Sequence, residues 1–152
     1  MSCKFLFTFL VALFFASAPL CRAAEDDIVI LNTLGYTTGQ SVLLTHMAVG
    51  TLADAFVAKT YKSGEAKDFV TTYIKVTQGM KEQMNKLLDA DTLDKNDTKF
   101  IQNTVEVLDL VLKEGNALKE FVSSGDDEDA KAYEKARKKA LGDIKTLLGM
   151  KD

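Results

Sequence analysis

The chain has 152 residues, of which 47% are hydrophobic and 27% are charged, and its formal net charge is −3. The overall balance is acidic, so a nucleic-acid partner is not expected. Both cysteines, Cys3 and Cys21, lie near the start. The rest of the chain therefore contains no disulfide, no thiolate nucleophile and no cysteine metal ligand.

Residues 1–23 have the pattern of a secretory signal peptide. Lys4 is followed by an apolar run that extends to Leu20, and small residues precede the expected cleavage after Ala23. A lipoprotein would need a small residue before Cys21, where this chain has Leu20. The apolar run is also short for a membrane span. We therefore expect a periplasmic or secreted protein with no stable membrane insertion after cleavage.

Residues 24–40 are predicted to form a lead-in segment. They begin acidic, continue through an apolar patch, and then contain Gly35 and Gly39. These glycines are spaced by three residues, and Gln40 stands where a phosphate-binding loop has lysine, so no nucleotide site is expected. We expect a few helical turns or an extended joint here, with Ser41 as the N-cap of the next helix.

Residues 42–58 form the most apolar stretch after the signal peptide. Only Thr45, His46, Thr51 and Asp54 are markedly polar in this stretch, and on a helical wheel they leave no broad polar face. A helix that is apolar nearly all round is usually shielded on several sides. We therefore predict that a helix over about residues 41–62 is the most buried one. It is also the expected contact with a protein partner or with a second copy of the chain.

Three further amphipathic helices follow, over about residues 65–90, 97–123 and 126–149, with apolar residues at steps of three and four. The run of acids at residues 126–129 suits the positive end of a helix dipole. Short connections require neighbouring helices to run antiparallel. The predicted fold is all-α: an up-down-up-down four-helix bundle domain over residues 41–152, preceded by the signal peptide and the lead-in segment.

Aromatic residues gather toward one end of the predicted bundle. One end of the predicted bundle holds the turn between the first two helices and the turn between the last two. Counting positions from these turns places the aromatic residues within about two helical turns of that end. An aromatic-lined mouth for a small apolar or planar ligand is one interpretation, and an ordinary aromatic core layer is the other. The candidate ligand-binding residues are Phe56, Phe69, Tyr73, Phe121 and Tyr133.

The same counting brings the single histidine to the level of several methionines. Imidazole and thioether groups suit copper(I), and a histidine with a methionine can hold haem iron. Methionines at helical spacing are, however, common core residues, and no haem-attachment sequence is present. The candidate metal residues are His46, Met47, Met80 and Met84.

No catalytic signature is apparent in the sequence. His46 lies in mid-helix among apolar residues, with no strained turn that would present a serine beside it. We therefore expect no catalytic residues, no enzyme activity and no bound cofactor. The predicted function is that of an exported helical bundle that binds proteins, with a small-ligand, copper or haem carrier as the alternative.

Overall fold

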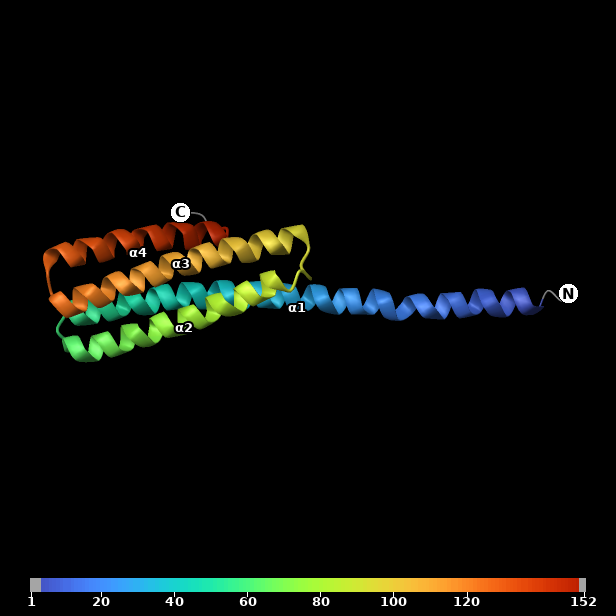
Figure 1. Cartoon of the computed structure of the whole chain (residues 1–152), viewed down its shortest axis with the longest axis horizontal. Helices are drawn as coiled ribbons and strands as arrows, with labels where there is room; N and C mark the ends of the chain where they lie inside the picture. The colour runs from blue at the N-terminus through green and yellow to red at the C-terminus, as the bar shows by residue number, and fades with distance from the viewer. Residues whose placement is uncertain (1–3, 151–152) are drawn as a thin grey trace. The chain divides into compact units, whose positions relative to one another are not determined.

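The computed structural model describes the backbone of residues 4–150 and the side chains of residues 29–150. Within this part the chain forms helices α1 (Lys4–Val57), α2 (Ser63–Asp89), α3 (Lys95–Ser124) and α4 (Asp127–Leu147), and no strand (Figure 1). The predicted signal peptide, residues 1–23, lies outside the residues whose side chains are described. The all-α prediction is confirmed.

The chain divides into two compact units, Met1–Tyr36 and Thr37–Asp152. The first unit contains the N-terminal part of α1. The second contains the remainder of α1 together with α2, α3 and α4. All contacts considered below belong to the second unit.

Helix α1 begins well before the predicted start at Ser41. The lead-in segment over residues 24–40 is helical throughout, and Ser41 lies inside the helix, where its hydroxyl donates to the Thr37 carbonyl at 2.8 Å. Gly39 does not interrupt the helix, and it is buried. A Cβ on Gly39 would lie 2.5 Å from Leu148 Cδ2, so glycine at this position lets α1 approach the end of α4 closely.

The ends of the other helices follow local chemistry. The side chain of Asp94 accepts hydrogen bonds from the backbone N–H groups of Asn96 and Asp97 and so caps α3. Gly125 ends α3 with a φ of 73°, a left-handed conformation that glycine adopts without a Cβ clash. The predicted break between helices over residues 97–123 and 126–149 is therefore confirmed.

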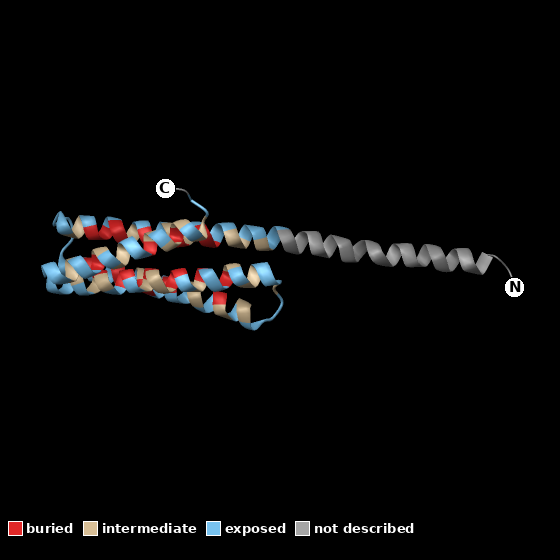
Figure 2. Cartoon of the chain, turned by 90° about the horizontal axis from the view of Figure 1, so that it is seen from above, coloured by how far each residue is buried: buried red, intermediate tan, exposed pale blue. Residues whose placement is uncertain are grey.

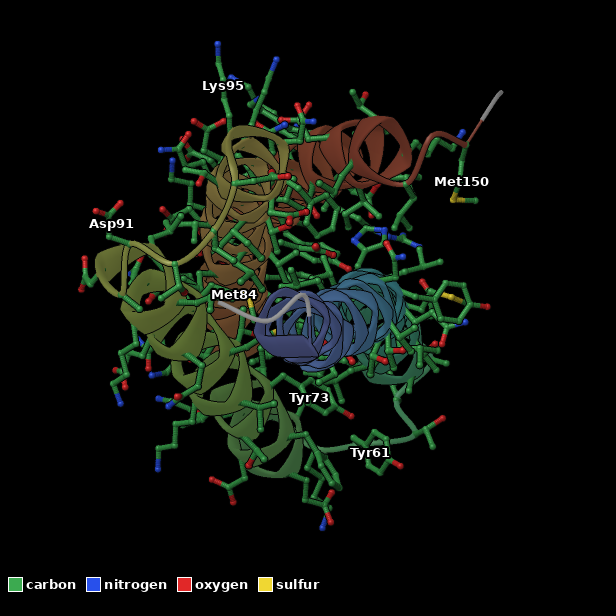
Figure 3. All side chains as sticks on the ribbon, turned by 90° about the vertical axis from the view of Figure 1, so that its right-hand side faces the viewer. Tyr61, Tyr73, Met84, Asp91, Lys95 and Met150 are labelled. Atoms are coloured by element: carbon green, nitrogen blue, oxygen red, sulfur yellow. The ribbon has the colours of Figure 1, made fainter. Side chains whose placement is uncertain are left out.

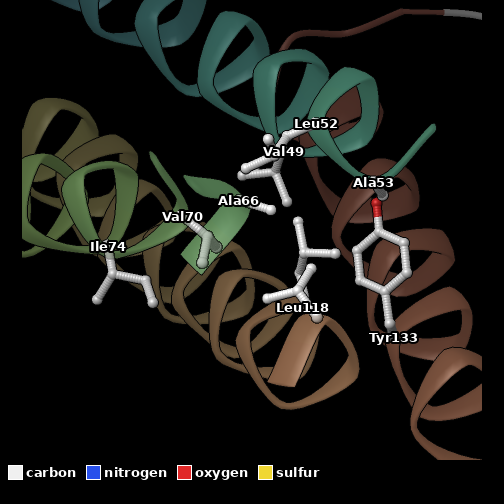
Figure 4. Packing of buried hydrophobic residues seen from close by; sticks show 9 residues of the cluster. Val49, Leu52, Ala53, Ala66, Val70, Ile74, Leu118 and Tyr133 are labelled. Carbon is white, nitrogen blue, oxygen red and sulfur yellow. The ribbon is translucent and has the colours of Figure 1, made fainter. Parts of the chain in front are cut away.

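The four helices share one core. Helix α3 packs along both α2 and α4, and buried residues of α1 join the cluster that these helices form (Figure 4). In Figure 2 the buried residues lie on the helix faces that turn toward one another. The central cluster consists of Val49, Leu52, Ala53, Ala66, Val70, Ile74, Leu118, Val122 and Tyr133.

Helix α1 is not enclosed on every side, although its sequence is apolar nearly all round. Val42, Val49 and Ala53 are buried, whereas Leu44 and Met47 are 63% and 56% exposed. The described part of the chain contains no helix that is long and apolar enough to cross a membrane.

Candidate functional site

A buried hydrogen-bonded pair, His46 and Glu114, joins α1 to α3. His46 Nδ1 lies 2.8 Å from Glu114 Oε2, and the two residues are only 5% and 0% exposed. His46 belongs to the buried face of α1 with Val42 and Val49, and Glu114 lies between Val111 and Leu118 on the buried face of α3. Separating a pair at such a depth is unfavourable, because each group would remain buried without its hydrogen-bond partner.

Burial raises the pKa of Glu114 above its ordinary value of 4.5, because the charged carboxylate is poorly solvated in the core. The hydrogen bond with His46 and the positive charge of Arg137 oppose this rise in the pKa, but they do not cancel it. The carboxyl group therefore keeps its proton to a higher pH than an exposed glutamate does.

Two polar atoms near this pair have no hydrogen-bond partner, namely Glu114 Oε1 and the hydroxyl of Tyr133. Tyr133 is only 2% exposed and belongs to the central core cluster. Burial raises the pKa of the Tyr133 hydroxyl, and the negative charge of Glu114 raises it further. The hydroxyl of Tyr133 therefore stays neutral. Toward Tyr133, Glu114 has a polar but uncharged neighbour.

The positive charge of Arg137, on α4, also acts on Glu114. Its guanidinium lies over the backbone of α1 at Gly50, where a Cβ would stand 3.0 Å from a terminal nitrogen of Arg137. The same group donates to Glu134 at 3.3 Å, and its side chain remains 34% exposed. The absence of a side chain at Gly50 therefore gives the guanidinium room beside the buried pair. We call His46, Glu114, Tyr133 and Arg137 the polar core cluster.

A separate feature lies on the outside of the bundle, between α1 and α2. A hollow of about 350 Å³ is formed by small residues of α1 and by the aromatic residues that follow it. Figure 3 shows Tyr61 and Tyr73 on the same side of the molecule. The lining residues are Ala48, Thr51, Leu52, Ala55, Thr60, Tyr61, Phe69 and Tyr73.

Exposed apolar side chains extend this hollow along both helices. Leu44 precedes the lining residue Ala48 by four positions, and Met47 precedes the lining residue Thr51 by four positions, so both lie on the same side of α1 as the hollow. On α2, Val76 follows Tyr73 by three positions and is 56% exposed, and Phe69 is 44% exposed. We call the following set the α1–α2 surface: Leu44, Met47, Ala48, Thr51, Phe69, Tyr73 and Val76.

The five aromatic residues predicted to bind a ligand fall into two places. Phe69 and Tyr73 line the hollow, where Phe69 also packs against Tyr61 with ring centroids 5.3 Å apart. Phe56 and Phe121 pack edge to face at 5.4 Å beside the core, and Tyr133 is inside it. The described residues thus bring Phe69 and Tyr73 together, and the other three contribute to core packing.

The four predicted metal residues have unlike surroundings. His46 is buried against Glu114, whereas the adjacent Met47 is 56% exposed on another face of α1. Met84 is buried and Met80 is half-buried. Among the described residues, no three His, Cys, Asp or Glu side chains come together as metal ligands. The structure gives His46 a carboxylate partner, Glu114.

Sequence reasoning missed Glu114 as the partner of His46. The available signal was its place in the apolar stripe of α3, three positions after Val111 and four before Leu118. A glutamate on the core face of a helix needs a partner from another element, and the chain contains one histidine. Comparison with protein-family models, with curated proteins and with solved structures finds no match to this chain.

Proposed function

We propose that this protein is exported and acts by binding another protein, or a second copy of itself, through the α1–α2 surface. The observation that carries the proposal is the exposure of large apolar side chains along one side of two adjacent helices. Contiguous apolar patches of this kind mark interaction sites in soluble proteins. Leu44 and Val76, at 63% and 56% exposed, flank the hollow and extend the patch beyond it.

We also propose that the helices run alternately up and down. Ser63, at the start of α2, donates to the carbonyl of Val122, near the end of α3. Phe56 and Phe121 pack together near the ends of α1 and α3. Both contacts support a bundle in which α1 and α3 point one way and α2 points the other.

The proposal involves no catalysis, and the position of His46 supports this. Its ring is buried against Glu114, and neither residue lines the hollow. A general base must come within hydrogen-bond reach of its substrate. A binding role therefore fits the exposed surface, and the polar core cluster fits a role inside the bundle.

Sedimentation velocity over a range of concentrations tests the self-association form of this proposal. We expect the mass of the native protein to rise with concentration, and the variant Leu44→Gln/Met47→Gln to stay monomeric. Both side chains are exposed, so the free energy of unfolding should change by less than about 0.5 kcal/mol. Urea denaturation checks this expectation.

Val57→Gln is the matched control, because Val57 is 65% exposed on α1 but lies outside the α1–α2 surface. It should associate as the native protein does. Equal association of the native protein and the Leu44→Gln/Met47→Gln variant would show that this surface is not where the copies meet.

A small apolar or planar ligand in the hollow is the second candidate function. The observation that favours it is the convergence of Tyr61, Phe69 and Tyr73 on one hollow of about 350 Å³, a size typical of ligand sites. Native mass spectrometry of the protein as isolated should then show added mass, and Phe69→Ala should lose it. Absence of any added mass on the native protein, or the same added mass on the Phe69→Ala variant, would contradict this candidate.

A further inference from the structure

The His46–Glu114 pair is a contact between helices as well as a pair of titratable groups. It joins the C-terminal part of α1 to α3 through a hydrogen bond of 2.8 Å inside the core. When the pair is protonated, one proton lies along that bond. It resides either on Glu114 Oε2, as a neutral acid beside a neutral imidazole, or on His46 Nδ1, as an ion pair. In both forms the pair has no net charge, which suits a buried position.

Loss of that proton changes the net charge of the buried pair. The pair then carries one negative charge, and Glu114 Oε1, which already has no hydrogen-bond partner, belongs to a buried carboxylate. An ionised carboxylate in an apolar environment is much less favourable than a neutral acid. In the unfolded chain the same carboxylate is hydrated, so proton loss disfavours the packed state.

The groups that face Glu114 do not remove this penalty. From α1 the facing group is His46, and from α4 they are Tyr133, Glu134 and Arg137. Arg137 alone among these is a permanent cation, and it is shared with Glu134 at 3.3 Å and partly exposed. The α2 residue beside the neighbouring Gly115 is the apolar Ile74.

We propose that the His46–Glu114 pair is a proton-dependent latch that holds α1 in the bundle, tight while the pair keeps its shared proton and weaker once that proton leaves at higher pH. The direction in which the pKa of Glu114 is shifted agrees with a packed state that weakens as the pH rises. Folding raises the pKa of Glu114 above 4.5. The contribution of the protonated Glu114 carboxyl group to the free energy of unfolding is therefore fully present below pH 4.5. It is lost as the pH rises through the folded value.

Hydrogen exchange of α1 amides in the native protein tests the latch. We expect the opening constant for residues 42–53, corrected for intrinsic exchange, to rise about tenfold or more as the pH is raised from 4.5 through the ionisation of Glu114. Glu114→Gln keeps the shape and a hydrogen bond to His46 but cannot ionise, so it should abolish this rise. Glu106→Gln, an exposed change on the same helix, should leave the rise unchanged.

NMR provides a second readout that does not depend on a variant folding. His46 is the only histidine, so an untagged protein gives one imidazole signal that can be followed together with the side-chain carbon of Glu114. We expect the Glu114 carboxyl signal to titrate above pH 4.5, and the imidazole signal reports whether the hydrogen bond between the two side chains persists. A Glu114 midpoint at or below that value would overturn the proposal. An identical rise in α1 opening in Glu114→Gln would overturn it as well.

Discussion

At the scale of single residues, burial decides what the same amino acid does. Gly79 lies exposed on α2 with open space where a Cβ would stand, whereas a Cβ on the buried Gly115 of α3 would lie 3.0 Å from Ile74 Cγ1. Ile74 is only 8% exposed and β-branched, so its side chain has little freedom to move away. One glycine is therefore replaceable, and the other maintains a close approach of α2 and α3.

We predict opposite effects for alanine at these two glycines. Gly79→Ala should raise the free energy of unfolding by up to about 1 kcal/mol, because alanine favours the helix. Gly115→Ala should lower the free energy of unfolding by about 1 kcal/mol, because overpacking outweighs the same gain. Urea denaturation measures both. A stabilising Gly115→Ala would mean that α2 and α3 are packed less tightly at this point than described.

Sequence reasoning reached His46 but not its surroundings. Periodicity locates a residue along a helix but leaves open which neighbour it faces, since the rotation of α1 depends on packing with the other helices. The structure turns His46 inward to Glu114 and Met47 outward. Consecutive residues in a helix differ by about 100°, so a shared height along the bundle does not put their side chains in one place.

At the scale of the helices, two caps that look alike in sequence differ in structure. Asp94 before α3 accepts two backbone hydrogen bonds, from Asn96 at 2.7 Å and from Asp97 at 2.9 Å. Asp126 before α4 makes no capping hydrogen bond with its side chain. The backbone N–H of Asp126 itself donates a hydrogen bond to the hydroxyl of Ser124 at 3.1 Å.

Asp94→Ala should therefore destabilise the protein by about 1 kcal/mol, because two backbone donors of α3 lose their acceptor. Asp126→Ala is the control and should cost only a few tenths of a kcal/mol, mainly through the helix dipole. Thermal or urea denaturation compares the two variants. Equal losses would show that charge near the helix start, rather than the cap itself, accounts for the effect.

Helix existence was predictable from the sequence, and the start of α1 was not. The stripes of apolar residues in α2, α3 and α4 identify those helices to within a few residues of their observed bounds. Gly35 and Gly39 suggested a break before residue 41, because each glycine costs about 1 kcal/mol in a helix. The contact between Gly39 and Leu148 is tertiary, and it explains why a glycine is useful inside this helix.

At the scale of the whole molecule, the apolar character of α1 serves two purposes. Val42, Val49 and Ala53 pack in the core, and Leu44 and Met47 remain outside. The sequence showed an excess of apolar residues in this helix, and the structure shows which of them the bundle leaves exposed. The polar core cluster lies inside and the α1–α2 surface lies outside, so the two proposals can fail separately.

The most direct test of the binding proposal is site-specific photo-crosslinking in the cell that produces the protein. A photoreactive residue at position 47 lies within the α1–α2 surface, and one at position 57 lies outside it while being similarly exposed. We predict a discrete product of higher mass from position 47 and none from position 57. Mass spectrometry of the product distinguishes a second copy from another protein. No product from position 47, or the same product from both positions, would contradict the account.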